Sequence, residues 1–145
     1  MDTEPRPLAL SALVAGLDGA RIVGGRDPLV RGLAIHSRKV REGDLFVCVP
    51  GNRDDGHRHA RDAMARGAVA LVVAHIQEEF GEVPQVRVGE TRPAMSALAA
   101  RFYGYSSSRL RVVGITGTEG KTTTAFLLDS ILRAAGRTTG CSGRS

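Results

Sequence analysis

A glycine-rich stretch at residues 112–124 constrains the fold of this chain more than any other feature. The apolar residues around its start, 110–116, predict a buried strand, and residues 121–135 predict a helix. Gly117 and Gly120 provide a turn between these two elements. One face of the expected helix carries Leu128, Ile131, Leu132 and Ala135. A buried strand that leads through a glycine turn into a helix is typical of the phosphate-binding loops of α/β proteins.

The residues at this turn have the chemistry that a nucleotide phosphate requires. Backbone N–H groups at the start of a helix, together with the positive end of its dipole, bind phosphate oxygens. Lys121 can reach the β- and γ-phosphates of ATP, and the Thr122 hydroxyl can hold Mg²⁺. The predicted ATP-binding residues are Gly117, Thr118, Glu119, Gly120, Lys121, Thr122 and Thr123.

The loop departs from the general phosphate-loop pattern, because Ile115 stands where that pattern has its first glycine. The alternative interpretation is a plain glycine turn that precedes a threonine-capped helix. Nucleotide binding is favoured because Lys121 is one of only two lysines in an arginine-rich chain and places a compact ammonium group beside the expected phosphates. The threonines at 122–124 are poor helix-interior residues but suit a phosphate-facing start.

The rest of the chain alternates short apolar runs with stretches of helical periodicity. Such alternation predicts an α/β fold, with parallel strand pairing wherever a helix connects two strands. Strands are expected at 30–35, 44–49, 68–73 and 86–88, and helices at 8–17, at 58–66 and from 91 onward. We expect Thr91 to cap the last of these helices and Pro93 to lie in its first turn. Residues 104–108 are small and polar and predict a linker.

The net charge of +5 does not by itself predict nucleic-acid binding. The 20 basic residues are scattered and aromatic residues make up only 4% of the chain, whereas nucleic-acid-binding surfaces combine clustered basic residues with aromatic ones. Cys48 and Cys141 lack the spacing of a zinc site or a disulfide framework, and His57 and His59 have no third metal ligand following them. The N-terminus does not have the pattern of a signal peptide, and no apolar run approaches the roughly 20 residues of a membrane span. We therefore expect a cytoplasmic protein without nucleic-acid partners or membrane insertion.

Several ordered motifs resemble those of the Mur ligase family. Residues 114–124 are similar to its phosphate loop, T-G-T-x-G-K-[ST], which lacks the outer glycine and so accounts for Ile115. Residues 37–47 resemble the family's S-R-x-V-x-x-G-D-L-F-V segment, and residues 51–57 resemble its G-x-x-x-D-G-H turn. Further similar segments are residues 66–70, 91–94 and 102–104. The resemblance therefore extends over most of the chain, from residue 8 to residue 140.

The resemblance implies a three-domain ligase. The family's N-terminal domain holds the UDP end of the substrate, its central domain binds ATP, and its C-terminal domain brings the amino acid. ATP phosphorylates a substrate carboxylate, and an amine then attacks the acyl phosphate to give an amide, ADP and phosphate. By its motifs the chain is most similar to the members that add diaminopimelate or lysine to UDP-MurNAc-L-Ala-D-Glu; members that add D-Ala-D-Ala are the nearest alternative.

The resemblance also assigns roles to residues of this chain. Lys121 is the expected catalytic residue, which stabilises the transferred charge, and Thr122 is the expected Mg²⁺ ligand. The residues expected near the uridine diphosphate are Ser37, Arg38, Asn52, Arg53 and Asp54. The chain departs from the family pattern at His36, where Asp or Asn is common, and at Glu119, where Asn is common.

The implied organisation is a small N-terminal α/β substrate-binding domain at 1–103, a linker at 104–109, and the first strand, phosphate loop and helix of a truncated ATP-binding domain at 110–145. We therefore expect an N-terminal piece of a ligase that is inactive by itself. Two alternatives of another kind stay open: a non-catalytic module that binds a UDP-MurNAc peptide, and an unrelated small P-loop ATPase or kinase.

Overall fold

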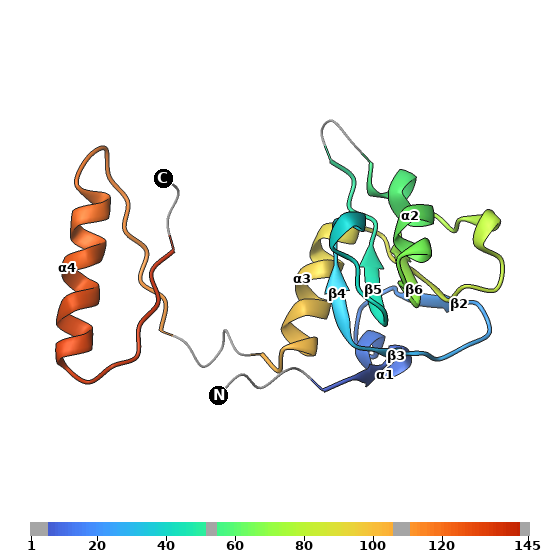
Figure 1. Ribbon diagram of the computed structural model, residues 1–145, viewed down its shortest axis with the longest axis horizontal. Helices are drawn as coiled ribbons and strands as arrows, with labels where there is room; N and C mark the ends of the chain where they lie inside the picture. Colours follow the sequence, from blue (N-terminus) through green and yellow to red (C-terminus); the bar gives the residue numbers. More distant parts are fainter. Residues whose placement is uncertain (1–5, 52–54, 106–110, 143–145) are drawn as a thin grey trace. The chain divides into compact units, whose positions relative to one another are not determined.

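The structure, a computed structural model, describes residues 6–51, 55–105 and 111–142 of the chain (Figure 1). It divides into two compact units, Met1–Arg109 and Leu110–Ser145. Among the described residues the first unit contains all the assigned strands, and the second contains one long helix. The α/β class predicted from the alternating pattern is confirmed.

A five-stranded sheet forms the centre of the first unit, in the order β2–β7–β6–β5–β4. Its strands are β2 (Arg21–Val23), β4 (Gly32–Ala34), β5 (Asp44–Val47), β6 (Ala70–Val73) and β7 (Gln85–Arg87). The last four pair in parallel, with Leu45 opposite Ala70 and Val72 opposite Val86. The parallel pairing of β5 with β6 agrees with the helix predicted between them. β2 is the exception and lies antiparallel to β7. All residues of β5 and β6 are buried, as expected for parallel strands covered on both faces.

Helices cover both faces of this sheet. They are α1 (Leu10–Val14), α2 (Ala60–Ala65) and α3 (Thr91–Phe102). Side chains alternate along each strand, so Leu45 and Val47 belong to one hydrophobic core and Phe46 to the other. α1 and α3 complete the core around Leu45, whereas α2 completes the core around Phe46. The short 3-10 helices are η1 (Ser37–Lys39), η2 (Gly56–His59) and η3 (Glu78–Phe80).

The N-terminal segment differs from the predicted helix at 8–17. Its first residues form a strand, β1 (Leu8–Ala9), which pairs antiparallel with β3 (Leu29–Val30), so helix α1 follows this strand. The Asp27 carboxylate accepts hydrogen bonds from the Ser11 hydroxyl (2.6 Å) and the Ser11 N–H (2.8 Å), and these bonds lower the pKa of Asp27. The predicted strand at 30–35 is likewise divided, because β3 pairs with β1 while β4 pairs with β5.

The start of α3 also differs from expectation. Thr91 was expected to cap this helix, but it is the first helical residue, and Glu90 occupies the cap position without a side-chain hydrogen bond. Thr91 is 2% exposed, and its hydroxyl has no hydrogen-bond partner within the described part of the chain. The prediction is wrong because the Thr91 side chain is buried in the first unit. Pro93 does lie in the first turn, as predicted.

The second unit consists of α4 (Lys121–Ala134) and the extended segments on either side of it. The helix agrees with the predicted span 121–135, and Gly136, with a φ of 75°, ends it. The strand predicted at 110–116 is not assigned over the described residues 111–116, since the described part of this unit contains no other strand with which it could pair. The apolar side of α4 is correspondingly open, with Ile131 65% exposed.

Candidate functional site

A hollow of about 360 Å³ lies where the chain leaves the carboxyl end of β4. It is lined by Ile35, His36, Ser37, Arg38, Lys39 and His59. Open α/β sheets bind their ligands in this position, outside the carboxyl ends of parallel strands. The hollow therefore lies where the fold itself predicts a ligand site.

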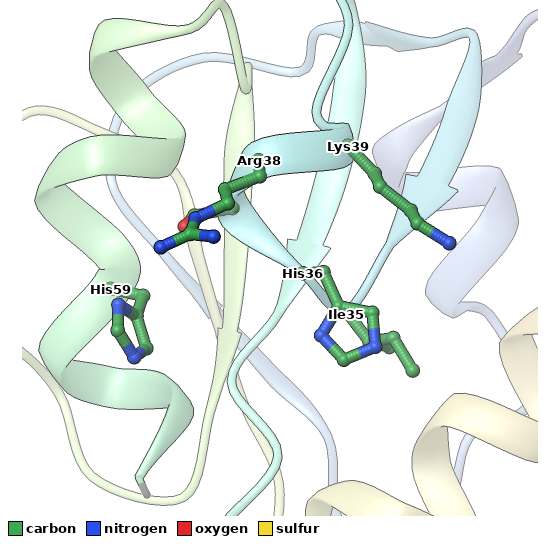
Figure 2. Close-up of a pocket in the computed structure, with 6 residues that line it drawn as sticks. Ile35, His36, Arg38, Lys39 and His59 are labelled. Carbon is green, nitrogen blue, oxygen red and sulfur yellow. The ribbon is translucent and has the colours of Figure 1, made fainter.

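The 3-10 helix η1 shapes one wall of the hollow. Its turn is closed by hydrogen bonds from the Lys39 N–H to the His36 carbonyl (2.9 Å) and from the Val40 N–H to the Ser37 carbonyl (3.2 Å). In Figure 2 the Arg38 side chain extends toward the helix beside His59, whereas the Lys39 side chain extends to the other side. Ser37 is only 8% exposed, while Arg38 and Lys39 are exposed. One short turn thus presents a hydroxyl group and two cations.

The opposite wall comes from η2 and α2. His59 ends η2 and lines the hollow, and Asp62 follows in α2. Hydrogen bonds from Ser37 and from Arg66 (3.0 Å from its Nε) lower the pKa of Asp62. These contacts connect α2 with η1, so the two walls of the hollow are held by elements that follow neighbouring parallel strands.

The segment between β5 and η2 closes through a hydrogen bond from the Gly56 N–H to the Val49 carbonyl (3.1 Å). The Asp55 carboxylate caps η2 by accepting from the His57 N–H (3.0 Å), and the same oxygen lies 2.6 Å from the His57 Nδ1. These hydrogen bonds to His57 lower the pKa of Asp55. The His57 Nε2 accepts from the Ala74 N–H (3.3 Å) at the end of β6. The start of η2 is therefore joined both to Val49 after β5 and to Ala74 after β6.

Two of the five residues predicted near the uridine diphosphate, Ser37 and Arg38, line this hollow together. The other three, Asn52, Arg53 and Asp54, lie outside the described residues. Sequence reasoning did not assign Lys39 or His59 to the site. Lys39 could have been found because it adjoins Arg38 in the same motif, whereas His59 is brought in only by the order of the strands.

The hollow suits an anionic ligand with polar groups. Among the described residues its lining includes the cations Arg38 and Lys39 and no carboxylate. A guanidinium group binds phosphate oxygens through paired N–H donors, and an ammonium group binds them as a point charge. The Ser37 hydroxyl, which donates to Asp62, can still accept a hydrogen bond from an uncharged polar group. A phosphorylated small molecule fits this combination of groups.

The glycine turn of the second unit forms a separate candidate site. Gly120 is the N-cap of α4 with a left-handed φ of 75°, and no side chain caps this helix. The Lys121 ammonium donates to the carbonyl groups of Gly117 and Thr118, the latter at 3.3 Å. Thr122 and Thr123 are exposed in the first turn, where backbone N–H groups have no partner within a helix. The turn therefore brings Lys121 and uncapped N–H donors together.

The predicted loop residues Gly117 to Thr123 are thus contiguous at the start of α4, and Glu119 is exposed beside them. These groups fit a nucleotide phosphate, because the helix start offers N–H donors and Lys121 offers a positive charge. The Thr122 hydroxyl is an oxygen ligand of the kind that Mg²⁺ prefers. Within residues 6–51, 55–105 and 111–142, no three His, Cys, Asp or Glu side chains gather as a metal site would require.

Two further observations concern the described chain as a whole. Cys48 is buried and Cys141 is exposed, and both are free thiols. None of the described helices has the length and apolar character needed to cross a membrane.

Comparisons with known proteins agree with the motifs. Residues 29–103 match the model of the Mur ligase family, catalytic domain. The chain is 38% identical over 136 residues to the UDP-N-acetylmuramoyl-L-alanyl-D-glutamate–2,6-diaminopimelate ligase of Clostridium perfringens. The matched region covers 94% of this chain and 28% of that protein. The chain thus spans little more than a quarter of the length of this curated relative.

Solved structures give the same family. The chain is similar to MurF from Acinetobacter baumannii, with a TM-score of 0.71 and 27% identity over 90% of this chain and 28% of that one. It is also similar to the MurF ligase from Thermotoga maritima, solved in complex with ADP, with a TM-score of 0.55 and 33% identity over 72% of this chain and 24% of that one.

Proposed function

Because the chain belongs to the Mur ligase family, we propose that it is part of an ATP-dependent ligase of peptidoglycan precursor synthesis. The reaction adds diaminopimelate or lysine to UDP-MurNAc-L-Ala-D-Glu. One observation carries this proposal: the 38% identity to a diaminopimelate ligase extends over 136 of the 145 residues and so includes both the hollow and the glycine turn. We expect such a protein in the cytoplasm, since its substrates are nucleotides.

The first unit would hold the UDP end of the substrate. Arg38 and Lys39 would face the diphosphate, because they are the cations of the hollow, and Ser37 would meet an uncharged polar group. We propose Asn52, Arg53 and Asp54 as further contacts on the strength of the motif at 51–57. The division of the chain supports 1–103 as the substrate-binding domain, 104–109 as a linker and 110–145 as the beginning of the ATP-binding domain.

The second unit would hold ATP through residues 117–123. Lys121 would exchange its bonds to the Gly117 and Thr118 carbonyls for phosphate oxygens, and it would stabilise the negative charge that develops as the phosphoryl group is transferred. Thr122 would hold Mg²⁺, which neutralises phosphate charge when bound. The ADP complex of the Thermotoga maritima ligase, to which the chain is similar, supports the use of an adenine nucleotide.

The chemistry proposed for the whole enzyme divides amide formation into two steps. ATP activates the substrate carboxylate as an acyl phosphate, and the amino group of the incoming amino acid then displaces phosphate. The products are the amide, ADP and phosphate. Within this chain the residues of the first unit bind and orient the nucleotide end, and Lys121 is the proposed catalytic residue.

Titration calorimetry with UDP-MurNAc-L-Ala-D-Glu tests the proposal. We expect the chain to bind this ligand and Arg38→Gln to weaken binding tenfold or more, because a charge-assisted hydrogen bond contributes about 1.5–3 kcal/mol. Arg61→Gln is the matched control, since Arg61 is 79% exposed, pairs with Glu79 and does not line the hollow. Binding of ATP without binding of the UDP ligand would refute the proposed role of the first unit as the substrate-binding domain.

A second candidate is the ligase that adds D-Ala-D-Ala, favoured by the structural similarity to MurF at a TM-score of 0.71. Phosphate release by the whole enzyme distinguishes the two reactions. Dependence on diaminopimelate or lysine with the dipeptide substrate supports the first reaction, whereas dependence on D-Ala-D-Ala with the tripeptide substrate supports the second. Ligand binding without either activity would support the non-catalytic module.

A further inference from the structure

The half-buried histidine of η2, His57, joins two parts of the first unit. Its side chain is 13% exposed, and both ring nitrogens have partners. Nδ1 lies 2.6 Å from a carboxylate oxygen of Asp55, which is the N-cap of η2, and Nε2 lies 3.3 Å from the backbone nitrogen of Ala74. Ala74 follows directly after β6. The imidazole ring therefore bridges the start of η2 and the end of a central strand.

These two partners define the protonation of the ring. A backbone N–H can only donate, so Nε2 accepts and carries no proton. An ionised carboxylate can only accept, so Nδ1 carries the proton and donates to Asp55. Among the described residues, Arg58 is a charged neighbour of Asp55, and the Ala74 N–H faces the ring from the position directly after β6. In this arrangement Nδ1 is the donor toward Asp55 and Nε2 is the acceptor from the Ala74 N–H.

The position of η2 matters because this short helix ends at His59, which lines the hollow. The opposite wall belongs to η1, which follows β4, so the distance between the walls depends on how η2 is held against the sheet. The Gly56 N–H bond to the Val49 carbonyl fixes the backbone at the first residue of η2. His57 supplies the side-chain bond from η2 to β6.

We propose that His57 is a positioning residue of the hollow. With Nδ1 donating to Asp55 and Nε2 accepting from the Ala74 N–H, it ties η2 to the end of β6 and so holds His59 in place at the wall. This inference deepens the proposed function and rests on it for the identity of the ligand. It assigns part of the affinity for a uridine diphosphate to a side chain that does not line the hollow.

The protonation is tested first, on the unmodified chain and without a ligand. Nitrogen-15 NMR of the histidine rings at mildly alkaline pH distinguishes a protonated ring nitrogen from an unprotonated one. We expect His57 to carry its proton on Nδ1, with His75, which is exposed and follows Ala74, as the reference histidine in the same spectrum. A proton on Nε2 of His57, or on both nitrogens, would overturn the proposal.

Positioning is tested by titrating UDP into variants of the full chain. We expect His57→Ala to weaken UDP binding about threefold to tenfold, the effect of losing one hydrogen bond. His57→Gln should restore much of this loss, because its side-chain carbonyl can accept from the Ala74 N–H. The control His75→Ala should leave UDP affinity unchanged.

The amide resonances of Arg58 and His59 give a readout that does not depend on the ligand. They should shift in His57→Ala and return toward their original positions in His57→Gln. If His57→Ala binds UDP as well as the unmodified chain, or if His57→Gln restores the thermal midpoint but not UDP affinity, His57 has only a structural role. If the unmodified chain does not bind UDP, the proposed ligand is refuted, while the ring protonation and the amide shifts still decide whether His57 positions η2.

Discussion

Replacing Gly56 by alanine tests how rigidly the backbone at the start of η2, beside the candidate site, is held against the sheet. A Cβ atom at this position would lie 2.7 Å from the Val49 nitrogen and 2.9 Å from the Val49 oxygen. Both are backbone atoms, and the Val49 carbonyl already accepts the Gly56 N–H. Neither atom can move aside as a flexible side chain could, so the connection between β5 and η2 must shift.

The expected cost follows from these distances. Overpacking of this kind costs about 1–3 kcal/mol, and the stiffer unfolded chain offsets about 0.4–1 kcal/mol of it. Because both contacts are with backbone atoms, the upper half of the first range applies, and we expect Gly56→Ala to lower the free energy of unfolding of the first unit by about 1–2.5 kcal/mol. For a domain of this size the thermal midpoint should fall by about 4–8 °C for each kcal/mol.

Amide hydrogen exchange in β6 is a suitable assay, because these buried residues belong to the first unit alone. The Val72 amide should exchange about tenfold faster in Gly56→Ala for a loss of 1.4 kcal/mol. Gly89→Ala is the matched control, since a Cβ there would meet no atom within 4 Å. Equal exchange rates in the two variants would show that the contact with Val49 does not constrain this connection.

Two further predictions concern Lys121 and Cys48. Lys121→Ala should weaken ATP binding about tenfold to a hundredfold in calorimetry through loss of a charged hydrogen-bond donor, whereas Lys39→Ala, in the other unit, should leave ATP binding unchanged. Burial, with a smaller contribution from the charge of Asp55, raises the pKa of the Cys48 thiol from 9.0 to about 12. Alkylation followed by mass spectrometry should therefore modify the exposed Cys141 before Cys48, and equal modification would contradict this. Because the raised pKa favours the protonated thiol in the folded chain, its stabilising contribution is complete below pH 9.0 and declines toward pH 12, which urea denaturation over that interval measures.

The sequence predicted the elements whose apolar residues form a clear pattern along the chain. β5 and β6 are buried on both faces and appear as continuous apolar runs, and α4 appears as a periodic apolar stripe followed by glycine. β2 was not predicted, because all three of its residues are exposed at the edge of the sheet. A short exposed strand leaves no pattern of burial in the sequence. The N-terminal helix was predicted too long since local periodicity does not reveal the pairing of β1 with β3.

The candidate site was predicted only where its residues are adjacent in the sequence. Ser37 and Arg38 share one motif, so a resemblance could identify them together. His59 lines the hollow because β4 and β5 are neighbours in the sheet. The order of strands in a sheet cannot be predicted from the residues of either strand alone. The hydrogen bond between His57 and Ala74 could not be predicted for the same reason, since it joins residues 17 positions apart.

Gly56 and His57 are adjacent in η2, and their substitutions together test whether the position of η2 or the stability of the first unit determines the affinity for UDP. Alanine at Gly56 acts through a backbone clash, so it should lower both the stability of the first unit and its affinity for UDP. Glutamine at His57 keeps a hydrogen-bond acceptor for the Ala74 N–H and creates no clash, so it should change both quantities little. If the position of η2 determines the UDP affinity of the hollow, the loss of affinity in Gly56→Ala, His57→Gln and His57→Ala should correlate with the amide shift of His59. It should not correlate with the free energy of unfolding. An affinity that followed the free energy of unfolding instead would mean that the hollow needs only a folded sheet and not a fixed η2.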